Sequence, residues 1–580
     1  MSLPEPIPPA QAAEHSPATA QSAPAPAAPV PPSDTAPPVV NHPLLRKITG
    51  VRDNPRVESF YGVPYGEVRK RWTQAQFVTL LDGLQAVKPG PRCPQPPSRG
   101  EAGCGPLLPH LETELEEDEF RCLNLNITRP VGYDDVFLPV MVWIHGGGFN
   151  VGSASEPIHN PVAFVEWSAS QGLPVIAIGV NYRLGPFGFL YSSDLDGARS
   201  AAFRGNFGLR DQRMALDWIH RNIEGFGGDS DRITIVGQSA GGYAIHAQLN
   251  AQTHYNIPPL FARAIVQSGP LADRHVWSIH RLDLIWAKMV KEAAAQAEAA
   301  LPDTPQERID SLRAVSAAKL IELGIVHCKV STWGVFHDGA FVPPEIYHHD
   351  GTFREAKPKV EALILGDVAD ERSVFLPRAK RRGKAPLLHA LRTLLSPEDA
   401  AKVEAAYKLD QELSVDELTV QMSYAAQDMR YLYPGDALAK AWPSAIRYHI
   451  SLPNTFEEAG RSYKGMAHHS IDVMYLFRNY NKFFTERGMT THTAVSDAMG
   501  RAWLLFMHGG EPWEHSARQG AHFGARGMEV VPRDKVKENE EEDRRLALWS
   551  NLGLVTTGRV ANVWISEEND RVDAGEAFVP

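Results

Sequence analysis

The chain has 580 residues, with 58 Lys and Arg against 69 Asp and Glu, which gives a formal net charge of −11. This acidic balance, without a basic patch, excludes nucleic acid as an expected partner. Hydrophobic residues make up 43% of the chain, which is enough for a large core, and no run of about 18 apolar residues occurs that would insert stably in a membrane.

The N-terminal segment differs from the rest in composition. Its first 40 residues hold 12 Pro and 10 Ala, and no Lys or Arg precedes Arg46. Because Pro blocks backbone hydrogen bonding and Ala buries little surface, we expect residues 1–44 to be a disordered tail and residues 45–580 to form one domain. The segment has neither a basic nor an apolar signal region, so we expect a cytoplasmic protein, with secretion as the alternative.

A glycine-rich loop follows the first strong strand pattern. Residues 138–144 read as a buried strand and run directly into His145-Gly146-Gly147-Gly148. Acyl transfer builds negative charge on a carbonyl oxygen, and backbone N–H groups can be aimed at that oxygen only where the chain folds tightly. We therefore expect Gly147 and Gly148 to contribute to an oxyanion hole.

A second strand pattern, over 233–236, runs into Gly237-Gln238-Ser239-Ala240-Gly241 and then into a helix pattern. A strand that turns at once into a helix places the middle residue on a strained, exposed corner. This arrangement is typical of a nucleophile at a helix N-terminus. The sequence therefore predicts Ser239 as the nucleophile and the N–H of Ala240 as a further oxyanion donor.

Further sequence blocks follow in a family-specific order: Phe60–Tyr65, Asn181–Leu190, Gly205–Gln212, Ala215–Ile219 and Gln267–Gly269. With them, the chain from about Gly50 to Phe578 resembles the type-B carboxylesterase/lipase family, and looks closest to its fungal carboxylesterases. This family also contains cholinesterases and fungal lipases. The resemblance implies an α/β-hydrolase fold, in which helices cover both faces of a large, mostly parallel central sheet.

The resemblance also guides the choice of the acid. A strand pattern over 360–366 runs into a turn with three acidic residues, Asp367, Asp370 and Glu371. In α/β-hydrolases the acid lies between the nucleophile and the histidine in the sequence. Glu371 matches the family's carboxylate, with Asp367 and Asp370 as structural alternatives. Arg372 departs from the family, in which a small residue is common at that place.

The base is expected after the next strand pattern, over 444–450. His469 precedes Asp472 by three residues and an aromatic-apolar run follows, which is the family's spacing, whereas His468 misses this spacing by one residue. We therefore expect His469 to be the general base, with His468 as the alternative. The sequence thus predicts hydrolysis of a small-molecule ester through an acyl-enzyme on Ser239. This chemistry needs no cofactor, and no metal-binding motif occurs.

Two cysteines, Cys93 and Cys122, match a disulfide of the family. Because no secretory signal is expected, a reduced pair is the alternative to a disulfide. Cys104 and Cys328 have no evident partner. The oligomeric state and the natural acyl and alcohol groups do not follow from the sequence.

Two other functions compete with a carboxylesterase: a lipase that acts on longer-chain acylglycerols, and a non-catalytic, cholinesterase-like binding protein. Family lipases carry an amphipathic lid between the two cysteines, but here residues 112–119 contain six acids in eight positions. Such a lid suits a lipid surface badly. The predicted triad argues against a non-catalytic protein, and Gln238, where cholinesterases carry Glu, argues against choline esters. A charged segment, 538–545, is expected to be a solvated helix face.

Overall fold

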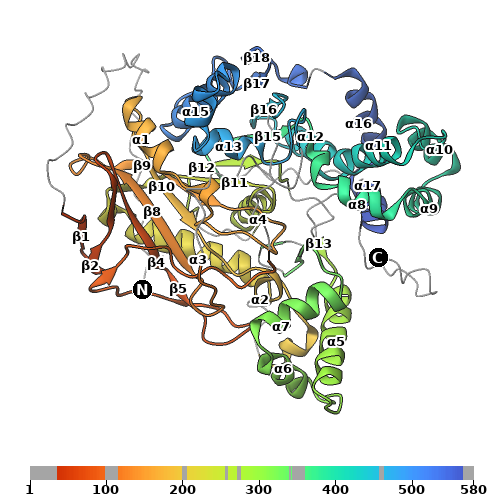
Figure 1. Ribbon diagram of the computed structural model, residues 1–580, viewed down its shortest axis with the longest axis horizontal. Coiled ribbons are helices and arrows are strands. Elements are labelled where there is room, and N and C mark those ends of the chain that lie inside the picture. The colour runs from red at the N-terminus through yellow and green to blue at the C-terminus, as the bar shows by residue number, and fades with distance from the viewer. Residues whose placement is uncertain are drawn as a thin grey trace, which may run out of the picture.

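An eleven-stranded sheet runs through the molecule in the order β18-β17-β16-β15-β12-β11-β9-β10-β8-β4-β3 (Figure 1). The neighbours from β17 to β10 pair in parallel, and antiparallel strands complete both edges. The computed structural model describes residues 36–97, 115–198, 205–254, 259–270, 276–338, 341–342, 359–455, 463–537 and 539–565. This topology confirms the predicted α/β fold with a mostly parallel sheet.

The strands of this sheet are β3 (Val51–Asn54), β4 (Val57–Pro64), β8 (Asn124–Pro130), β9 (Leu138–Ile144), β10 (Ile176–Val180), β11 (Gly228–Gln238), β12 (Arg263–Gln267), β15 (Ala362–Val368), β16 (Ile446–Ile450), β17 (Gln519–Gly524) and β18 (Gly527–Pro532). Smaller sheets contain β1 (Val39–His42), β2 (Arg46–Thr49) and β7 (Leu84–Gln85), then β5 (Gly66–Glu67) and β6 (Gln76–Phe77), then β13 (Val276–Trp277) and β14 (Val335–Phe336).

The helices are α1 (Val162–Ser170), α2 (Gly185–Gly188), α3 (Phe207–Asn222), α4 (Ala240–His254), α5 (Ile279–Gln296), α6 (Pro305–Ala314), α7 (Ala317–Glu322), α8 (Leu376–Arg382), α9 (Ala385–Leu394), α10 (Pro397–Ala406), α11 (Val415–Gln427), α12 (Tyr433–Ala441), α13 (Ile471–Phe477), α14 (Asn481–Glu486), α15 (Thr490–Met507), α16 (Glu540–Leu552) and α17 (Leu554–Ile565).

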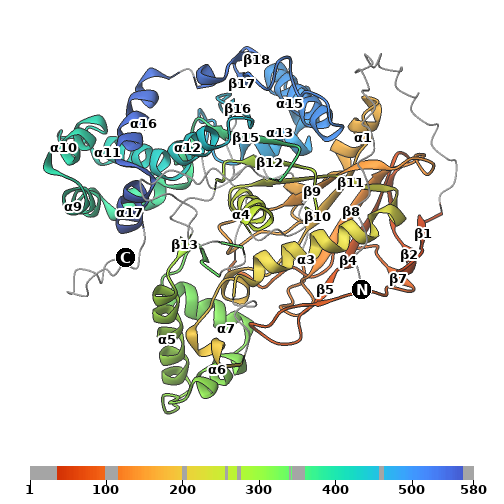
Figure 2. The same ribbon diagram turned by 180° about the vertical axis from the view of Figure 1, so that it is seen from behind.

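Two hydrophobic cores lie on opposite faces of the sheet. Successive side chains of a strand point to opposite faces, so on β9 Val142 and Ile144 join the core beneath α3 and α4 (Figure 2), whereas Met141 and Trp143 join the core beneath α1, α13 and α15. Because both faces are covered, the parallel strands β9 and β10 are apolar and buried along their whole length rather than on alternate residues.

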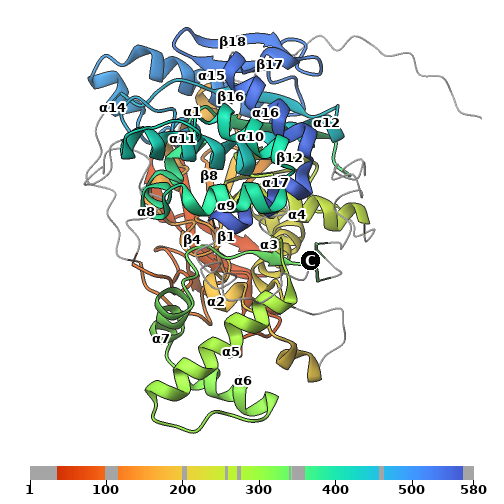
Figure 3. The same ribbon diagram turned by 90° about the vertical axis from the view of Figure 1, so that its right-hand side faces the viewer.

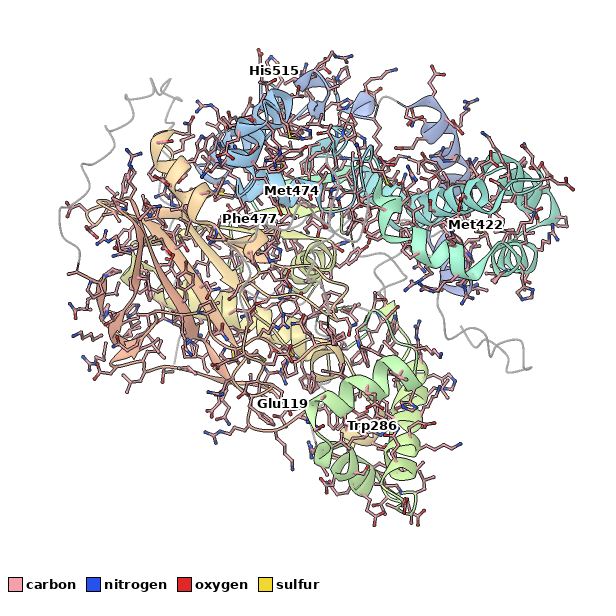
Figure 4. The ribbon with its side chains drawn as sticks, viewed as in Figure 1. Glu119, Trp286, Met422, Met474, Phe477 and His515 are labelled. Atoms are coloured by element: carbon pink, nitrogen blue, oxygen red, sulfur yellow. The ribbon has the colours of Figure 1, made fainter. Side chains whose placement is uncertain are left out.

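Helices α5, α6 and α7 form a lobe that projects from the sheet (Figures 1 and 3). Arg71 fastens this lobe, because its guanidinium donates to the carbonyl oxygens of Leu312 and Val315 and pairs with Glu119 at 2.5 Å. Figure 4 shows Glu119 at the border of the lobe and Trp286 inside it. The indole of Trp286 packs edge-on against Trp72, with ring centroids 4.9 Å apart.

The last two helices, α16 and α17, pack against the helices that follow β15 (Figure 3). Arg545 of α16 pairs with the buried Asp428 at 2.7 Å, and Trp549 donates to the hydroxyl of Tyr407 at 2.7 Å. Glu542 is buried as well. The expectation that segment 538–545 is a solvated helix face is therefore wrong for Glu542 and Arg545, because α16 buries that side of the helix against its neighbours.

The start of the folded domain differs from the predicted boundary at residue 45. Strand β1 (Val39–His42) pairs with β2, and Val40 and His42 are buried. His42 donates from Nε2 to the carbonyl oxygen of Asn222 at 2.7 Å and accepts from two backbone N–H groups at Nδ1. Composition placed the boundary too late because the Pro-rich tract ends only one residue before this strand. Residues 1–35 of the predicted tail lie outside the described residues.

Two N-terminal truncations should show where the folded domain begins. Deleting residues 2–34 removes only the Pro/Ala-rich tract and should leave the melting temperature unchanged. Deleting residues 2–42 also removes β1, which loses about 1.5–3 kcal/mol of burial at Val40 and about 1 kcal/mol of hydrogen bonding at His42. Differential scanning calorimetry of both proteins checks this. Equal melting temperatures for the two truncations would contradict the assignment of β1 to the domain.

Candidate active site

The turn between β11 and α4 is a tight, strained corner. Ser239 has a φ of 55°, in the left-handed region that residues other than glycine rarely adopt. A Cβ atom at Gly241 would lie 2.0 Å from the carbonyl oxygen of Ile144, so only glycine fits there. The N–H of Ser239 donates to Gln267 on β12 at 2.9 Å. The strained corner predicted at Ser239 is present, and its strain is held by close packing between β11, β9 and β12.

The glycine-rich loop follows β9, next to the corner. Gly147 and Gly148 have φ values of 96° and 63°, and a Cβ at Gly147 would lie 2.1 Å from the carbonyl oxygen of Val151. The N–H groups of Gly147 and Gly148 donate to no other described residue. Ala240 is the first residue of α4, where a helix leaves its N–H groups without an intrahelical partner. The loop and the helix start therefore offer free donors close to Ser239.

The three acids at the end of β15 and just after it have different partners. Glu371 is fully buried in a short 3₁₀ turn (Glu371–Val374), where its carboxylate accepts a hydrogen bond from His469 Nδ1. Its other oxygen accepts from the N–H of Val368 at 3.2 Å. Asp370 instead pairs with Arg372 at 2.8 Å and accepts from the N–H of Ala467. Of the three, Glu371 is the acid that the structure joins to His469.

Asp367 belongs to a separate buried ionic cluster. Its carboxylate accepts from His449 at 2.6 Å and lies 3.1 Å from the ammonium of Lys537, which is also buried. Burial opposes ionisation of Asp367, but Lys537, His449 and Arg447 outweigh it and hold the pKa of this carboxyl well below its usual range. The cluster joins the segment before α16 to the end of β15, which makes Asp367 structural.

The two adjacent histidines, His468 and His469, have different hydrogen-bond partners. His468 donates from Nδ1 to the backbone oxygen of His469 at 2.9 Å and stacks on Tyr463, and burial lowers its pKa to about 4. The imidazole of His469 donates to Glu371 instead, and the backbone N–H of His469 donates to the hydroxyl of Ser373 at 3.0 Å. His469 is thus the histidine that contacts both Glu371 and the end of β11, the strand that precedes Ser239.

Two residues contact His469 that the sequence did not link to the base. Gln238 directs its Nε2 at His469 Nε2, 3.1 Å away, and Tyr431 packs its ring 5.0 Å from the imidazole. Tyr431 lies in a π-helical turn (Asp428–Leu432), and no pattern in the sequence links it to the site. No hydrogen bond joins the Ser239 hydroxyl to His469, although both residues are described.

The site concentrates negative charge around one base. Burial lowers the pKa of His469, but the oxygens of Tyr431, Glu371 and Asp472 outweigh it and raise this pKa. Asp472 is fully buried in α13, where it accepts from Gln267 at 2.9 Å and from Tyr448 at 3.1 Å. Burial and the neighbouring Glu371 raise the pKa of Asp472 to about 6. The arrangement favours a histidine that takes up a proton and holds it as an ion pair.

The cysteines expected to pair are both buried free thiols. Cys93 and Cys122 contact each other, and this hydrogen bond together with burial raises the pKa of Cys122 well above its usual value. The structure therefore brings together the two cysteines that the family resemblance pairs. Cys328 is also a free thiol, and Cys104 lies outside the described residues.

The described ranges contain neither a metal-binding cluster nor a membrane-spanning helix. No group of three or more His, Cys, Asp or Glu is placed there to hold a metal ion. Within the same ranges, no helix has both the length and the apolar character needed to cross a bilayer.

Most of the chain matches a known protein family. The sequence profile described as "Carboxylesterase family" matches residues 38–542. This chain belongs to the carboxylesterase family. The matched range begins before β1, in agreement with the early start of the domain.

Several relatives of this carboxylesterase family member cover most of its length. The para-nitrobenzyl esterase of Bacillus subtilis (strain 168) is 29% identical over 87% of this chain and 98% of its own. Lipase 1 of Yarrowia lipolytica (strain CLIB 122 / E 150) is 28% identical over 79% and 85%. The inactive carboxylesterase-like protein VdtD of Byssochlamys spectabilis is 28% identical over 83% and 86%.

The fold is shared with a solved structure. A structure of PNB esterase superposes with a TM-score of 0.66 at 24% identity, and the match covers 88% of this chain and 99% of that one. The chain therefore has the α/β-hydrolase fold that its sequence motifs implied.

Substituting two of the three acids should separate stability from activity. Asp367→Asn leaves Lys537 without its closest carboxylate and should lower the free energy of unfolding by about 3 kcal/mol at neutral pH. Because the pKa of Asp367 is lowered in the folded state, this loss should shrink as the pH falls toward that lowered pKa. Glu371→Gln should instead lower hydrolysis of p-nitrophenyl acetate by about 10³-fold or more, with a small change in stability.

Urea unfolding and steady-state kinetics on both variants make the comparison. A folded Asp367→Asn protein that lacks activity, beside an active Glu371→Gln protein, would contradict the assignment.

Proposed function

We propose that this protein is a serine carboxylesterase that hydrolyses carboxylic esters through an acyl-enzyme on Ser239. The observation that carries the proposal is the hydrogen bond between Glu371 and His469, formed beside the strained corner of Ser239 and next to unpaired N–H groups of the glycine loop. Family membership supports hydrolysis of esters in general, whereas the site supports the serine mechanism in particular.

In the first half of the cycle, Ser239 Oγ attacks the carbonyl carbon of the ester and its proton passes to His469 Nε2. The carboxylate of Glu371 holds the Nδ1–H and stabilises the imidazolium that forms. The carbonyl oxygen becomes an oxyanion and accepts hydrogen bonds from the N–H groups of Gly147, Gly148 and Ala240. Donors that are already fixed stabilise this charge without reorganising during the reaction.

The intermediate then collapses to the acyl-enzyme. The bond between the carbonyl carbon and the alcohol oxygen breaks, and the alcohol leaves with the proton from His469 Nε2. A water molecule attacks the acyl group while His469 takes its proton, and the second intermediate releases the carboxylic acid and returns a proton to Ser239 Oγ. Each step uses only side chains and backbone groups of this chain, the ester and water.

Replacing the nucleophile tests the mechanism. Ser239→Ala should lower kcat by several orders of magnitude, because only oxyanion stabilisation and binding remain. A serine-reactive phosphonate should add one group to the wild-type protein, and peptide mass mapping should find it on Ser239. His468→Ala is the matched control for His469→Ala, and only the His469 variant should lose labelling.

Two outcomes would contradict this proposal, one for the function and one for the nucleophile. A wild-type protein that neither hydrolyses p-nitrophenyl acetate nor takes up the phosphonate would favour the non-catalytic alternative, which the inactive relative makes relevant. Labelling at a different serine would overturn the choice of nucleophile.

We further propose that the preferred substrates are dissolved short-chain or medium-chain esters. Three acids of the region where family lipases carry a lid form ion pairs with residues outside its described part: Glu116 with Lys88, Glu117 with Arg92 and Glu119 with Arg71. Asp118 pairs with the neighbouring Arg121. Backbone hydrogen bonds also join Arg92 to Glu116 and Asp118. Residues 98–114, which include Glu112 and Glu114, lie outside the described residues.

These ion pairs weigh against interfacial activation. A lid that opens on lipid must release its anchors and gain about 25 cal/mol for each Å² of apolar surface that it buries there. The described part of this segment is polar and held by ion pairs. Opening the segment would therefore break these ion pairs and bring charged side chains against the lipid. Binding of a dissolved ester requires no such movement.

Rates on tributyrin should therefore rise smoothly through the solubility limit of this substrate, without an upward break. The measurement is a titration of released acid against tributyrin concentration, with a known interfacial lipase as the positive control. Emulsified long-chain triacylglycerol should be hydrolysed poorly. A sharp increase in rate at the solubility limit would favour the lipase alternative instead.

A further inference from the structure

The residue before the nucleophile, Gln238, contacts the base directly. Its side chain is fully buried at the end of β11, and Nε2 of its amide lies 3.1 Å from Nε2 of His469. The amide oxygen is buried and has no hydrogen-bond partner among the described residues. An amide held in this way, with one end on the base and the other end unpaired, points to a role at the base.

The chemistry of this contact depends on which imidazole nitrogen carries the proton. Nδ1 of His469 donates to Glu371, so in a neutral imidazole Nε2 carries the lone pair and accepts from the Gln238 amide N–H. The opposite orientation of the amide would bring two acceptor atoms together. The observed contact therefore belongs to the unprotonated form of the base.

We propose that Gln238 is a positioning residue that holds His469 in its unprotonated, proton-accepting form by donating an amide hydrogen bond to Nε2. This inference rests on the proposed serine mechanism, in which Nε2 must be free of a proton before Ser239 attacks. The Ser239 hydroxyl then takes the place of the amide when a substrate is bound, because one lone pair cannot serve both donors.

The surroundings of His469 explain why such a residue is needed. The groups that face the imidazole are Glu371 from the turn after β15, Asp472 from α13 and Tyr431 from the π-helical turn, with His468 next to it in its own loop. The first three favour an imidazolium, which cannot accept the serine proton. A neutral donor to Nε2 opposes them, since a hydrogen bond made only to the neutral form disfavours protonation.

The amide also differs from both obvious replacements. A carboxylate at residue 238 would add a third carboxylate beside the imidazole, after Glu371 and Asp472, and would favour the protonated base. An apolar side chain of similar size would remove the donor without adding charge. Gln238→Glu and Gln238→Leu therefore test the charge and the hydrogen bond separately.

The experiment measures kcat/KM for p-nitrophenyl acetate against pH, since the acid limb reports the ionisation of the base in the free enzyme. Gln238→Leu should move this limb to higher pH, and Gln238→Glu should move it further, by about 1 unit or more. Above the limb, Gln238→Leu should approach the wild-type kcat/KM. Gln171→Glu, an exposed substitution directly after α1, adds the same charge at the surface and should leave the profile unchanged.

A purely structural role predicts a different result, in which kcat/KM falls by the same factor at every pH and the limb does not move. That result, in variants with wild-type melting temperatures, would overturn the proposal. NMR titration of the His469 Nδ1–H resonance gives a readout independent of turnover. If the wild-type protein is inactive, the proposed function fails, yet an unchanged His469 titration in both variants would still count against Gln238 separately.

Discussion

The close packing of backbone around Ser239 is the constraint on which the site depends. A Cβ at Gly241 would lie 2.0 Å from the carbonyl oxygen of Ile144, and one at Gly269 would lie 2.3 Å from that of Ser239. These contacts bring the ends of β9, β11 and β12 closer than any side chain would permit. This packing holds the left-handed φ of Ser239, and α4 begins at the next residue, Ala240.

Buried charge is the second theme of the structure, and it has two distinct uses. Around Asp367 the charges are balanced, because Lys537, Arg447 and His449 surround the carboxylate and join the C-terminal helices to the sheet. Around His469 the charges are unbalanced, with Glu371 and Asp472 close to a single base. The balanced cluster holds two parts of the chain together, whereas the unbalanced charges raise the proton affinity of the imidazole.

Membership of the carboxylesterase family does not by itself decide whether a protein is active. The chain is about equally similar to a bacterial esterase, a yeast lipase and a fungal protein described as inactive. A fold can be kept while a few side chains change the chemistry. In this protein the informative features are therefore individual contacts: that of Glu371 with His469, that of Gln238 with Nε2 of the same imidazole, and that of Glu119 with Arg71.

The sequence by itself determined the features that depend on local backbone geometry. The glycines of the 145–148 loop and of the corner at Ser239 could be interpreted directly, because only glycine meets the steric demands of such turns. The apolar runs likewise predicted several of the strands, whereas the mostly parallel sheet was implied by the family resemblance. The choice of Glu371 and His469 over Asp367 and His468 came from family spacing, since the neighbouring residues have the same chemistry.

Only the tertiary structure decided what depends on residues far apart in the chain. Composition could not show that Val40 and His42 are buried in a strand, or that α16 buries Glu542 and Arg545, because burial is a property of what packs against a segment. The contact of Gln238 with His469 joins positions that are 231 residues apart. No local pattern encodes such a contact, because it exists only once β11 and the loop after β16 meet at the same edge of the sheet.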